Sequence, residues 1–236
     1  MILYLKMALK RTFETVSRRF SDGFLFLSDF IFPRGLLEEE LLHLSARVIS
    51  KRGRGAEEIG NANIRAFFSY KDGFIRNLIW LLKYKKNVRV AELFAEILAD
   101  HILEDISEHS LLGGSGNFLL IPIPMHGVGY ARRGYNQVEI LASEIQKILG
   151  QNVDLRVNIL EKIRETPAQS SLKKRRDRLA NLAGCFAVAE RSGVEIQEKN
   201  IILIDDVITT GATMREARRA LRAHGARKIL CYAIAH

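Results

Sequence analysis

The sequence predicts an α/β protein in which helices flank a mainly parallel sheet, with a helical segment at the N-terminus. From residue 118 onward, short apolar runs of strand length alternate with longer stretches of helical periodicity, which is the pattern of a parallel sheet. One apolar run, at 201–206, ends in two adjacent carboxylates and leads through a hydroxyl-rich turn into a helical stretch. The chain has 236 residues and is 47% hydrophobic, which is ordinary for a packed core. We therefore expect a ligand beyond the carboxyl ends of the strands.

The N-terminal quarter of the chain predicts helices. Residues 1–60 are expected to form a helical segment, because leucines recur near helical spacing after Pro33 and Gly35. The glycines and basic residues of 51–55 break this pattern and indicate a mobile linker. The domain that carries the main sheet is placed at 61–236.

The elements of that domain follow from the spacing of apolar residues and from the turn residues between them. Strands are expected near 64–70, 118–123, 157–160, 185–189, 201–206 and 229–234. Helices are expected near 75–86, 88–105, 136–149 and 213–224. Lys83, Lys85 and Lys86 stand at the end of the first of these helices, where cations suit the helix dipole. Gly150 follows the third helix directly and is expected to end it.

The most informative stretch is 201–213, IILIDDVITTGAT. Asp205 and Asp206 stand where the strand ends, and adjacent carboxylates can accept hydrogen bonds from a vicinal diol. The threonine hydroxyls and the helix start that follow suit a phosphate, so the turn predicts a ribose 5-phosphate site with both acids on the sugar. The alternative is a plain strand-to-helix turn with an aspartate cap, which needs fewer polar groups. The residues expected at the 5-phosphate are Val207, Ile208, Thr209, Thr210, Gly211, Ala212 and Thr213.

A second anion site is predicted after the strand at 118–123. The turn and the helix start in this region carry donors that suit a pyrophosphate group. The alternative is a polar loop with an asparagine helix cap. The residues expected at the pyrophosphate are Met125, His126, Gly127, Arg133, Asn136 and Gln137.

A basic loop at 164–181 is the third piece of the predicted site. We interpret it as a mobile flap that closes on a charged substrate and excludes water. A solvated basic loop is the alternative. The flap residues singled out are Gln169, Lys173, Lys174, Arg175 and Arg176.

Charge and cysteine content narrow the class of protein. The chain has 36 Lys and Arg against 27 Asp and Glu, a net charge of +9, which suits phosphates, nucleotides or nucleic acid. Cys185 and Cys231 are far apart and lack metal-ligand spacing, so we expect no zinc, no resident metal and a reducing cytoplasm. No apolar stretch is long enough to cross a bilayer and no secretory signal is evident, so no membrane insertion is expected.

The motif IILIDDVITTGAT closely resembles the signature with which type I phosphoribosyltransferases bind phosphoribosyl pyrophosphate (PRPP). RRGYNQ at 132–137 and TPAQSSLKKRRDRLANLAGCF at 166–186 resemble the ComF/GntX branch, which is associated with natural competence and use of external DNA. This resemblance covers about 64–236 and implies a type I phosphoribosyltransferase-like fold. It also implies PRPP or a related phosphorylated ribose as ligand, Mg²⁺ bound mainly through PRPP, and Asp205 and Asp206 as catalytic acids. Many members carry an N-terminal zinc ribbon, but this chain has no cysteine there.

Three functions remain open on this evidence. The first is phosphoribosyl transfer to an unknown acceptor with release of pyrophosphate. The second is a non-catalytic competence accessory protein that contacts single-stranded DNA or a helicase-like protein of the competence machinery. The third is a nucleotide-sensing regulator on the same fold. The P-loop motif and a convincing dinucleotide fingerprint are both missing from the sequence.

Overall fold

The computed structural model describes residues 41, 43–56, 64–114, 116–164, 184–190 and 192–236. The helices expected within 1–40 lie outside the described residues, as do the flap residues Gln169, Lys173, Lys174, Arg175 and Arg176. A compact unit runs from Ser45 to His236. The domain boundary at residue 60 stays a prediction.

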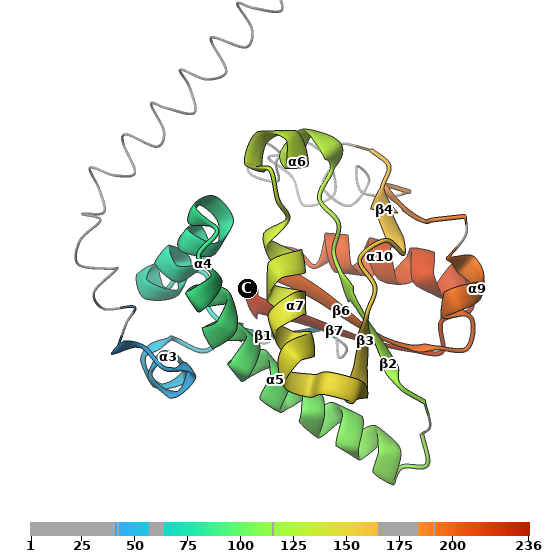
Figure 1. The fold of residues 1–236 in the computed structure, drawn as a ribbon, viewed down its shortest axis with the longest axis horizontal. Helices are drawn as coiled ribbons and strands as arrows, with labels where there is room; N and C mark the ends of the chain where they lie inside the picture. The colour runs from blue at the N-terminus through green and yellow to red at the C-terminus, as the bar shows by residue number, and fades with distance from the viewer. Residues whose placement is uncertain (1–40, 42, 57–63, 115, 165–183, 191) are drawn as a thin grey trace, which may run out of the picture. The chain divides into compact units, whose positions relative to one another are not determined.

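A five-stranded sheet, parallel throughout, forms the centre of this unit (Figure 1). Its strands, in spatial order, are β1 (Ile64–Phe68), β7 (Lys228–Ala235), β6 (Asn200–Val207), β2 (Phe118–Pro122) and β3 (Val153–Leu155). All five residues of β2 and the first five of β6 are buried. Such runs, buried on both faces, are what a parallel sheet covered by helices requires. The predicted fold class is therefore confirmed.

The helices cover both faces of the sheet (Figure 1). Helices α5 (Val88–Leu111), α7 (Gln137–Leu149) and α10 (Ala212–Ala223) pack against its strands. Helix α4 (Gly73–Lys85) packs against α5, and α6 (Gly127–Arg133) lies at the end of the sheet beyond β2 (Figure 1). The chain runs from β2 through α7 to β3, and in the opposite direction along the sheet from β6 through α10 to β7. Because parallel crossovers are right-handed, opposite directions place α7 and α10 on opposite faces.

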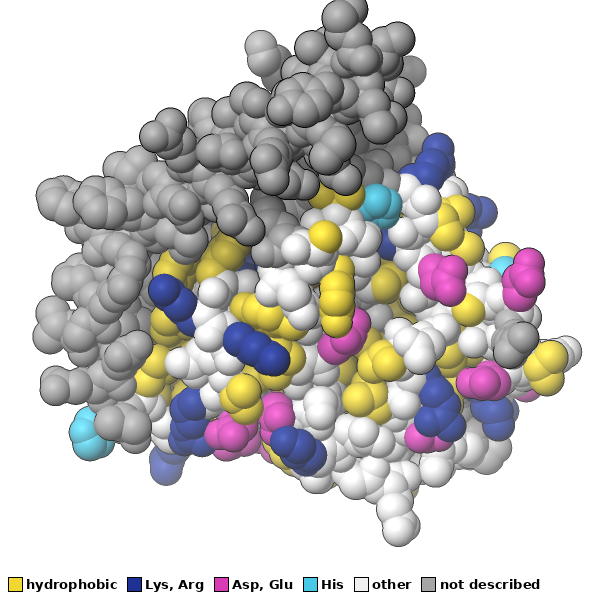
Figure 2. Space-filling model, turned by 45° about the horizontal axis from the view of Figure 1, so that its top comes forward, with side chains coloured by type: hydrophobic (Ala, Val, Ile, Leu, Met, Phe, Trp, Pro, Cys, Tyr) yellow, Lys and Arg dark blue, Asp and Glu magenta, His cyan; other side chains and the backbone are white. Residues whose placement is uncertain are grey.

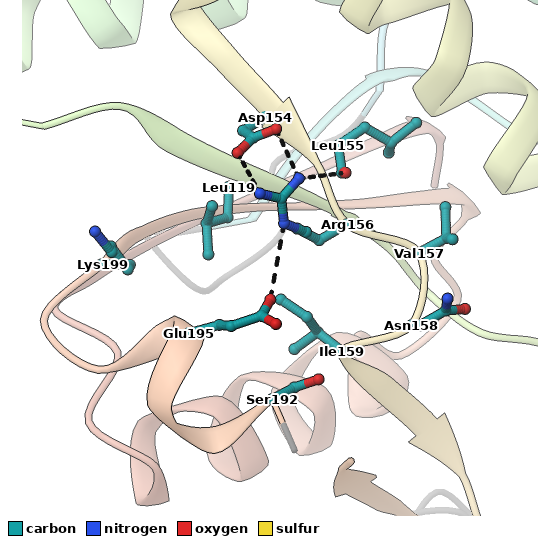
Figure 3. A pocket seen from close by; sticks show the side chains of 10 residues that line it. All are labelled: Leu119, Asp154, Leu155, Arg156, Val157, Asn158, Ile159, Ser192, Glu195 and Lys199. Atoms are coloured by element: carbon teal, nitrogen blue, oxygen red, sulfur yellow. Dashed lines mark hydrogen bonds and ion pairs between the residues drawn. The ribbon is translucent and has the colours of Figure 1, made fainter. Parts of the chain in front are cut away.

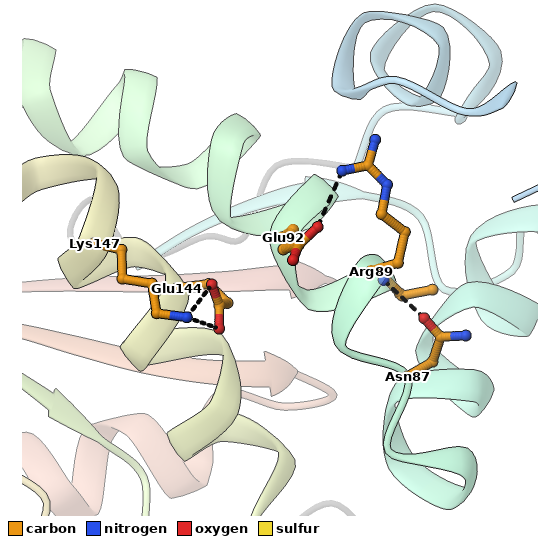
Figure 4. A network of polar contacts seen from close by, with 6 residues as sticks. Asn87, Arg89, Glu92, Glu144 and Lys147 are labelled. Carbon is orange, nitrogen blue, oxygen red and sulfur yellow. Dashed lines mark hydrogen bonds and ion pairs between the residues drawn. The ribbon is translucent and has the colours of Figure 1, made fainter. Parts of the chain in front are cut away.

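Local sequence explains the buried face of α4 and the start of α5. Spacing of apolar residues predicts the buried face of α4, and the structure buries the same four residues: Ile75, Leu78, Ile79 and Leu82. Helix α5 is longer than expected; its N-cap, Asn87, accepts a hydrogen bond from the Val90 amide at 3.1 Å (Figure 4). Figure 4 also shows the pairs Arg89–Glu92 and Lys147–Glu144 on α5 and α7. The Arg89–Glu92 pair is exposed at both side chains, and pairs of that kind add little stability.

The segment expected as a mobile linker is tied to the domain instead. Helix α3 (Ala46–Arg52) ends at Gly53. The amide of Ser69 donates to the carbonyl of Arg54 at 2.8 Å, and the amide of Arg54 donates to Asp72 Oδ2 at 2.8 Å. Residues 53–55 are therefore held against the turn that follows β1.

Several short elements differ from the expectation. The strands expected at 157–160 and 185–189 do not join the main sheet: β4 (Leu160–Lys162) and β5 (Phe186–Val188) pair antiparallel in a sheet of their own. The sequence missed β3, which at three residues is too short for a periodic signal. It also missed α6, because two of the seven residues of α6 are glycine, a poor helix former. The 3₁₀ turn η1 (Gly150–Asn152) and the short helix α9 (Gly193–Ile196) were not expected either.

Within the described ranges, no helix has both the length and the apolar character needed to cross a membrane.

Candidate functional site

The site predicted from the sequence lies at the switch point of the sheet. Strands β2 and β6 are neighbours, with Ile121 opposite Leu203 and Pro122 opposite Ile204. The chain leaves β2 toward one edge of the sheet and leaves β6 toward the other. In open α/β sheets the crevice between such diverging connections is the place where ligands bind. The loops after Pro122 and after Val207 leave from this same end of the sheet.

A recess lies where β6 gives way to α10. It is lined by Asp205, Val207, Ile208, Thr209, Gly211, Thr213 and Met214. Five of these seven are residues that the sequence assigned to the 5-phosphate. The two others in that set, Thr210 and Ala212, form a long hydrogen bond of 3.4 Å from the Ala212 amide to Thr210 Oγ1.

The recess is nearly closed in this structure. Its free volume is about 10 Å³, which is room for one water molecule at most. Gly211, the N-cap residue of α10, has no side chain that could bond the first amides of the helix. A phosphate at this turn would therefore meet the free amides of a helix N-terminus, although the free volume of the recess in this structure is too small to enclose it.

Gly211 is required at its position by the backbone. Its φ of 69° lies in the left-handed region, which other residues occupy at a cost. A Cβ placed there would lie 3.0 Å from Arg215 Nη1 and 3.4 Å from Ile64 Cδ1. A larger side chain would therefore strain the turn and crowd its neighbours at once.

The two acids of the motif have different surroundings. Asp205 is partly exposed, borders the recess and accepts a hydrogen bond from the Asp206 amide at 2.8 Å. Burial, and then the neighbouring Asp206 carboxylate, raise the pKa of Asp205 to about 7. Asp206 is only 4% exposed and is not among the residues that line the recess. The sequence placed both acids on one sugar, whereas the structure brings only Asp205 to the recess.

Both carboxylate oxygens of Asp206 are already engaged. Oδ1 lies 3.2 Å from Lys83 Nζ, and Oδ2 accepts a hydrogen bond from Gln137 Nε2 at 2.5 Å. Gln137 Oε1 in turn accepts from Arg133 Nη1 at 3.0 Å. Burial lowers the pKa of Lys83, but the Asp206 carboxylate more than offsets this, so the net shift of the Lys83 pKa is upward. The chain of contacts therefore runs from a charged lysine, through a carboxylate and an amide, to an arginine.

The residues assigned to the pyrophosphate fall into two groups. Met125, His126 and Gly127 follow β2 at the switch point, and His126 Nδ1 accepts from the Val128 amide at 3.4 Å as the cap of α6. Arg133 and Gln137 belong to the chain of contacts just described. Their place in the fold agrees with the predicted anion site, although pyrophosphate binding itself stays a prediction.

Asn136 has a structural task in this arrangement. It is 3% exposed, and its Oδ1 accepts from the Val138 amide at 3.0 Å at the start of α7. Its Nδ2 donates to the carbonyl of Ile123 at 3.1 Å and to Glu139 Oε1 at 3.1 Å. The structure thus supports the alternative interpretation of Asn136 as a helix cap, one that also ties α7 to the end of β2.

Sequence reasoning missed Lys83 as a member of the site. The spacing of α4 indicated only a cation at a helix end, and no local signal connects residue 83 with residue 206. The connection arises because α4 ends near the switch point, where Tyr135 Oη donates to the Lys83 carbonyl at 2.8 Å.

A more open hollow lies elsewhere on the domain (Figure 3). It follows the β3 edge, and the side chain of Arg156 bridges Asp154 Oδ2, at 2.6 Å, and Glu195 Oε2, at 3.8 Å, within it. None of the predicted site residues lines it. Three of its charged side chains, Asp154, Arg156 and Glu195, are paired with one another. Because the motif residues lie elsewhere, we favour the small recess at the switch point as the site of function. The described residues contain no cluster of metal-binding side chains.

Comparison with known proteins identifies the relationships of the chain. The family described as phosphoribosyl transferase domain matches residues 90–236. Competence protein F of Haemophilus influenzae is 33% identical over 116 residues, which cover 49% of each chain. Competence protein ComFC of Streptococcus pneumoniae is 31% identical over 72% of this chain and 66% of its own length. The DNA utilization protein YhgH of Escherichia coli O157:H7 is 28% identical over 63% of this chain and 61% of its own.

These matches confirm the resemblance to the ComF branch that the sequence motifs indicate. The aligned part spans about half to two thirds of the length of these relatives. The similarity to these relatives therefore concerns this part of their length only. Lys83 precedes residue 90, where the family match begins.

Proposed function

This chain belongs to the phosphoribosyl transferase domain family, and on that premise we propose that it binds PRPP with Mg²⁺ at the switch point between β2 and β6. The observation that carries the proposal is the recess after β6. There a left-handed glycine, threonine hydroxyls and a helix start adjoin the carboxylate of Asp205. The turn suits a phosphate and the carboxylate suits a vicinal diol. A ribose 5-phosphate carries both groups.

The chemistry we propose is transfer of the phosphoribosyl group to an unknown acceptor. The bond from ribose C1 to pyrophosphate breaks, a bond to the acceptor forms, and pyrophosphate leaves with the bonding electrons. The 207–213 loop would hold the phosphate and Asp205 would hold the diol, so that the reacting carbon is fixed in place. Arg133 would offset charge on the departing pyrophosphate.

The donor set fits magnesium carried by the substrate. Mg²⁺ in such sites is usually held by one or two carboxylates together with substrate phosphates. Of the two acids here, Asp206 is already paired with Lys83, which leaves Asp205 as the carboxylate next to the recess. When bound with PRPP, Mg²⁺ would neutralise charge on the pyrophosphate oxygens.

A binding panel tests this function directly. Calorimetry would measure the affinity of the full chain for PRPP, ribose 5-phosphate and pyrophosphate, each with and without Mg²⁺. We expect binding of PRPP that strengthens with Mg²⁺ and weakens in Thr213→Val, which removes a hydroxyl from the recess. Ser192→Ala, in the hollow of Figure 3, is the control and should bind normally. If none of the three ligands binds the wild-type chain, the proposed site is wrong. If PRPP does bind, an assay for pyrophosphate release in the presence of nucleobases would distinguish turnover from binding alone.

A second candidate is a non-catalytic role in DNA uptake or DNA utilization, which the names of the relatives and the net charge of +9 favour. On the face in Figure 2, however, the basic side chains of the described residues alternate with acidic and apolar ones and form no continuous track. Binding to a labelled single-stranded oligonucleotide that falls steeply with salt would support this role. Both roles belong in the cytoplasm in our proposal, because Cys185 and Cys231 are free thiols.

A further inference from the structure

We infer that the two acids of the motif have separate tasks: Asp205 binds the sugar, whereas Asp206 is a positioning residue that orients Arg133 through Gln137 and is neutralised by Lys83. The inference rests on the proposed function, since it divides labour within that site. It makes Lys83, on a helix that precedes the family match, part of the site.

The contacts of Asp206 leave it little capacity for a ligand. Its side chain is 6% exposed, against 18% for Lys83, and each carboxylate oxygen already has a partner. A diol could bond Asp206 only by displacing the partly buried Lys83 ammonium or the buried Gln137 amide. Leaving such a group unpaired costs more than the new bond returns. Asp205 has no comparable competitor among the described residues, because its backbone bond to Asp206 occupies only Oδ1.

The direction of the Gln137 amide explains how Asp206 acts on Arg133. An amide has one acceptor oxygen and one donor nitrogen at opposite corners. Since the Asp206 carboxylate can only accept, it fixes the nitrogen of Gln137 on its own side and turns the oxygen toward Arg133. The guanidinium is further held over the ring of Tyr84, 5.0 Å from the centroid. Its Nε–H is buried and has no hydrogen-bond partner among the described residues.

Helix α4 supplies both the lysine and the tyrosine of this arrangement. The end of α4 is anchored by Tyr135, whose hydroxyl donates to the Lys83 carbonyl and accepts from the Lys86 amide at 3.0 Å. Tyr135 lies only two residues from Gln137 along the chain. The segment expected at the pyrophosphate thus also sets the position of Lys83. The two halves of the site are physically connected through residues that need not touch the ligand.

The test compares ligand affinities in three variants of the full chain. Calorimetry would titrate ribose 5-phosphate and, separately, pyrophosphate, both without Mg²⁺ so that a metal on Asp205 does not contribute, into wild type, Asp205→Asn, Lys83→Met/Asp206→Asn and Lys83→Met/Asp206→Ala. The two double variants remove both charges together, so neither leaves a buried ion unpaired. They differ in that an asparagine at position 206 keeps an acceptor for Gln137, whereas an alanine does not.

We expect Asp205→Asn to weaken ribose 5-phosphate about tenfold or more and to change pyrophosphate by less than about threefold, because only the sugar loses a charged acceptor. Lys83→Met/Asp206→Asn should keep both affinities within about threefold of wild type. Lys83→Met/Asp206→Ala should weaken pyrophosphate about fivefold or more and spare ribose 5-phosphate. A purely structural role for Asp206 would not produce this selectivity. If the alanine variant does not fold, Gln137→Met breaks the same connection and should show the same selective loss.

The results that would overturn this inference differ from the result that would refute the proposed function. If Lys83→Met/Asp206→Asn loses ribose 5-phosphate as strongly as Asp205→Asn, then Asp206 touches the sugar and the inference is overturned. It is also overturned if the alanine variant and Gln137→Met bind pyrophosphate as wild type does. If wild type binds neither ligand, the proposed function fails and the inference fails with it.

Discussion

Lys83→Met is the perturbation whose effect on stability the structure predicts most directly. The change removes the cation that lies 3.2 Å from Asp206 Oδ1 and leaves a carboxylate with a 6% exposed side chain. Removing one partner of a buried ion pair costs about 3–5 kcal/mol. Since the Lys83 side chain keeps 18% exposure, we expect the lower end, about 3 kcal/mol. For a domain of this size that corresponds to a fall in Tm of about 6–12 °C.

A double variant separates the effect of the lost ion pair from the effect of lost packing at Lys83. Adding Asp206→Asn to Lys83→Met removes the orphaned charge, so the double variant should recover most of the lost free energy of unfolding. Urea titration followed by circular dichroism measures each value. Arg89→Met is the matched control, because Arg89 pairs with Glu92 at 3.0 Å while both side chains are exposed, at 46% and 42% (Figure 4). That variant should lose less than about 1 kcal/mol.

The ion-pair reasoning fails if Lys83→Met stays within about 1 kcal/mol of wild type, as its exposed control does. It also fails if the double variant is as unstable as the sum of the two single variants, since independent sites add and coupled ones do not.

Single residues elsewhere in the domain support three more predictions. Gly211→Ala should destabilise the domain by about 1–2 kcal/mol because φ is 69° there. Gly134→Ala, at φ 76° with open space around it, should lose a similar amount in thermal unfolding; an unchanged Tm for both would contradict the strain. Because the folded-state pKa of Asp205 is raised from 3.8 to about 7, its ionisation should lower the stability of wild type relative to Asp205→Asn as pH rises from about 4 to 7. Urea midpoints that keep a constant difference over that window would refute the shift. Asn136→Ala should cost about 1–2 kcal/mol through loss of its buried cap. Asn87→Ala, at the part-buried cap of α5, should cost less, and equal denaturation midpoints would argue against the buried cap.

Much of the site could be predicted because its residues are neighbours in sequence. The 205–213 stretch contains its own strand end, its acids, its turn glycine and its helix start. Local chemistry of this kind is visible without any tertiary contact. The same holds for the buried face of α4 and for the start of α7 at Asn136, where spacing and capping preferences act within one or two turns.

Other parts could not be predicted because their partners are far apart in sequence or their signal is short. The antiparallel pairing of β4 with β5 depends on a three-residue register across the 165–183 segment. The strand β3 has three residues, too few for periodicity to distinguish it from a loop. Lys83 and Asp206 are separated by 123 positions, and nothing local to either one indicates the other.

Short-range patterning of residues was enough to predict the fold class, the order of the central elements and the chemistry of the turn at 205–213. Which of the two adjacent acids adjoins the recess emerged only in the folded domain. Successive residues of a strand point to opposite faces of the sheet. One carboxylate therefore reaches the mouth of the crevice, while its neighbour meets a lysine from another helix. The different surroundings of the two acids depend on where α4 and α7 lie relative to the sheet. The local sequence around either acid does not predict that packing.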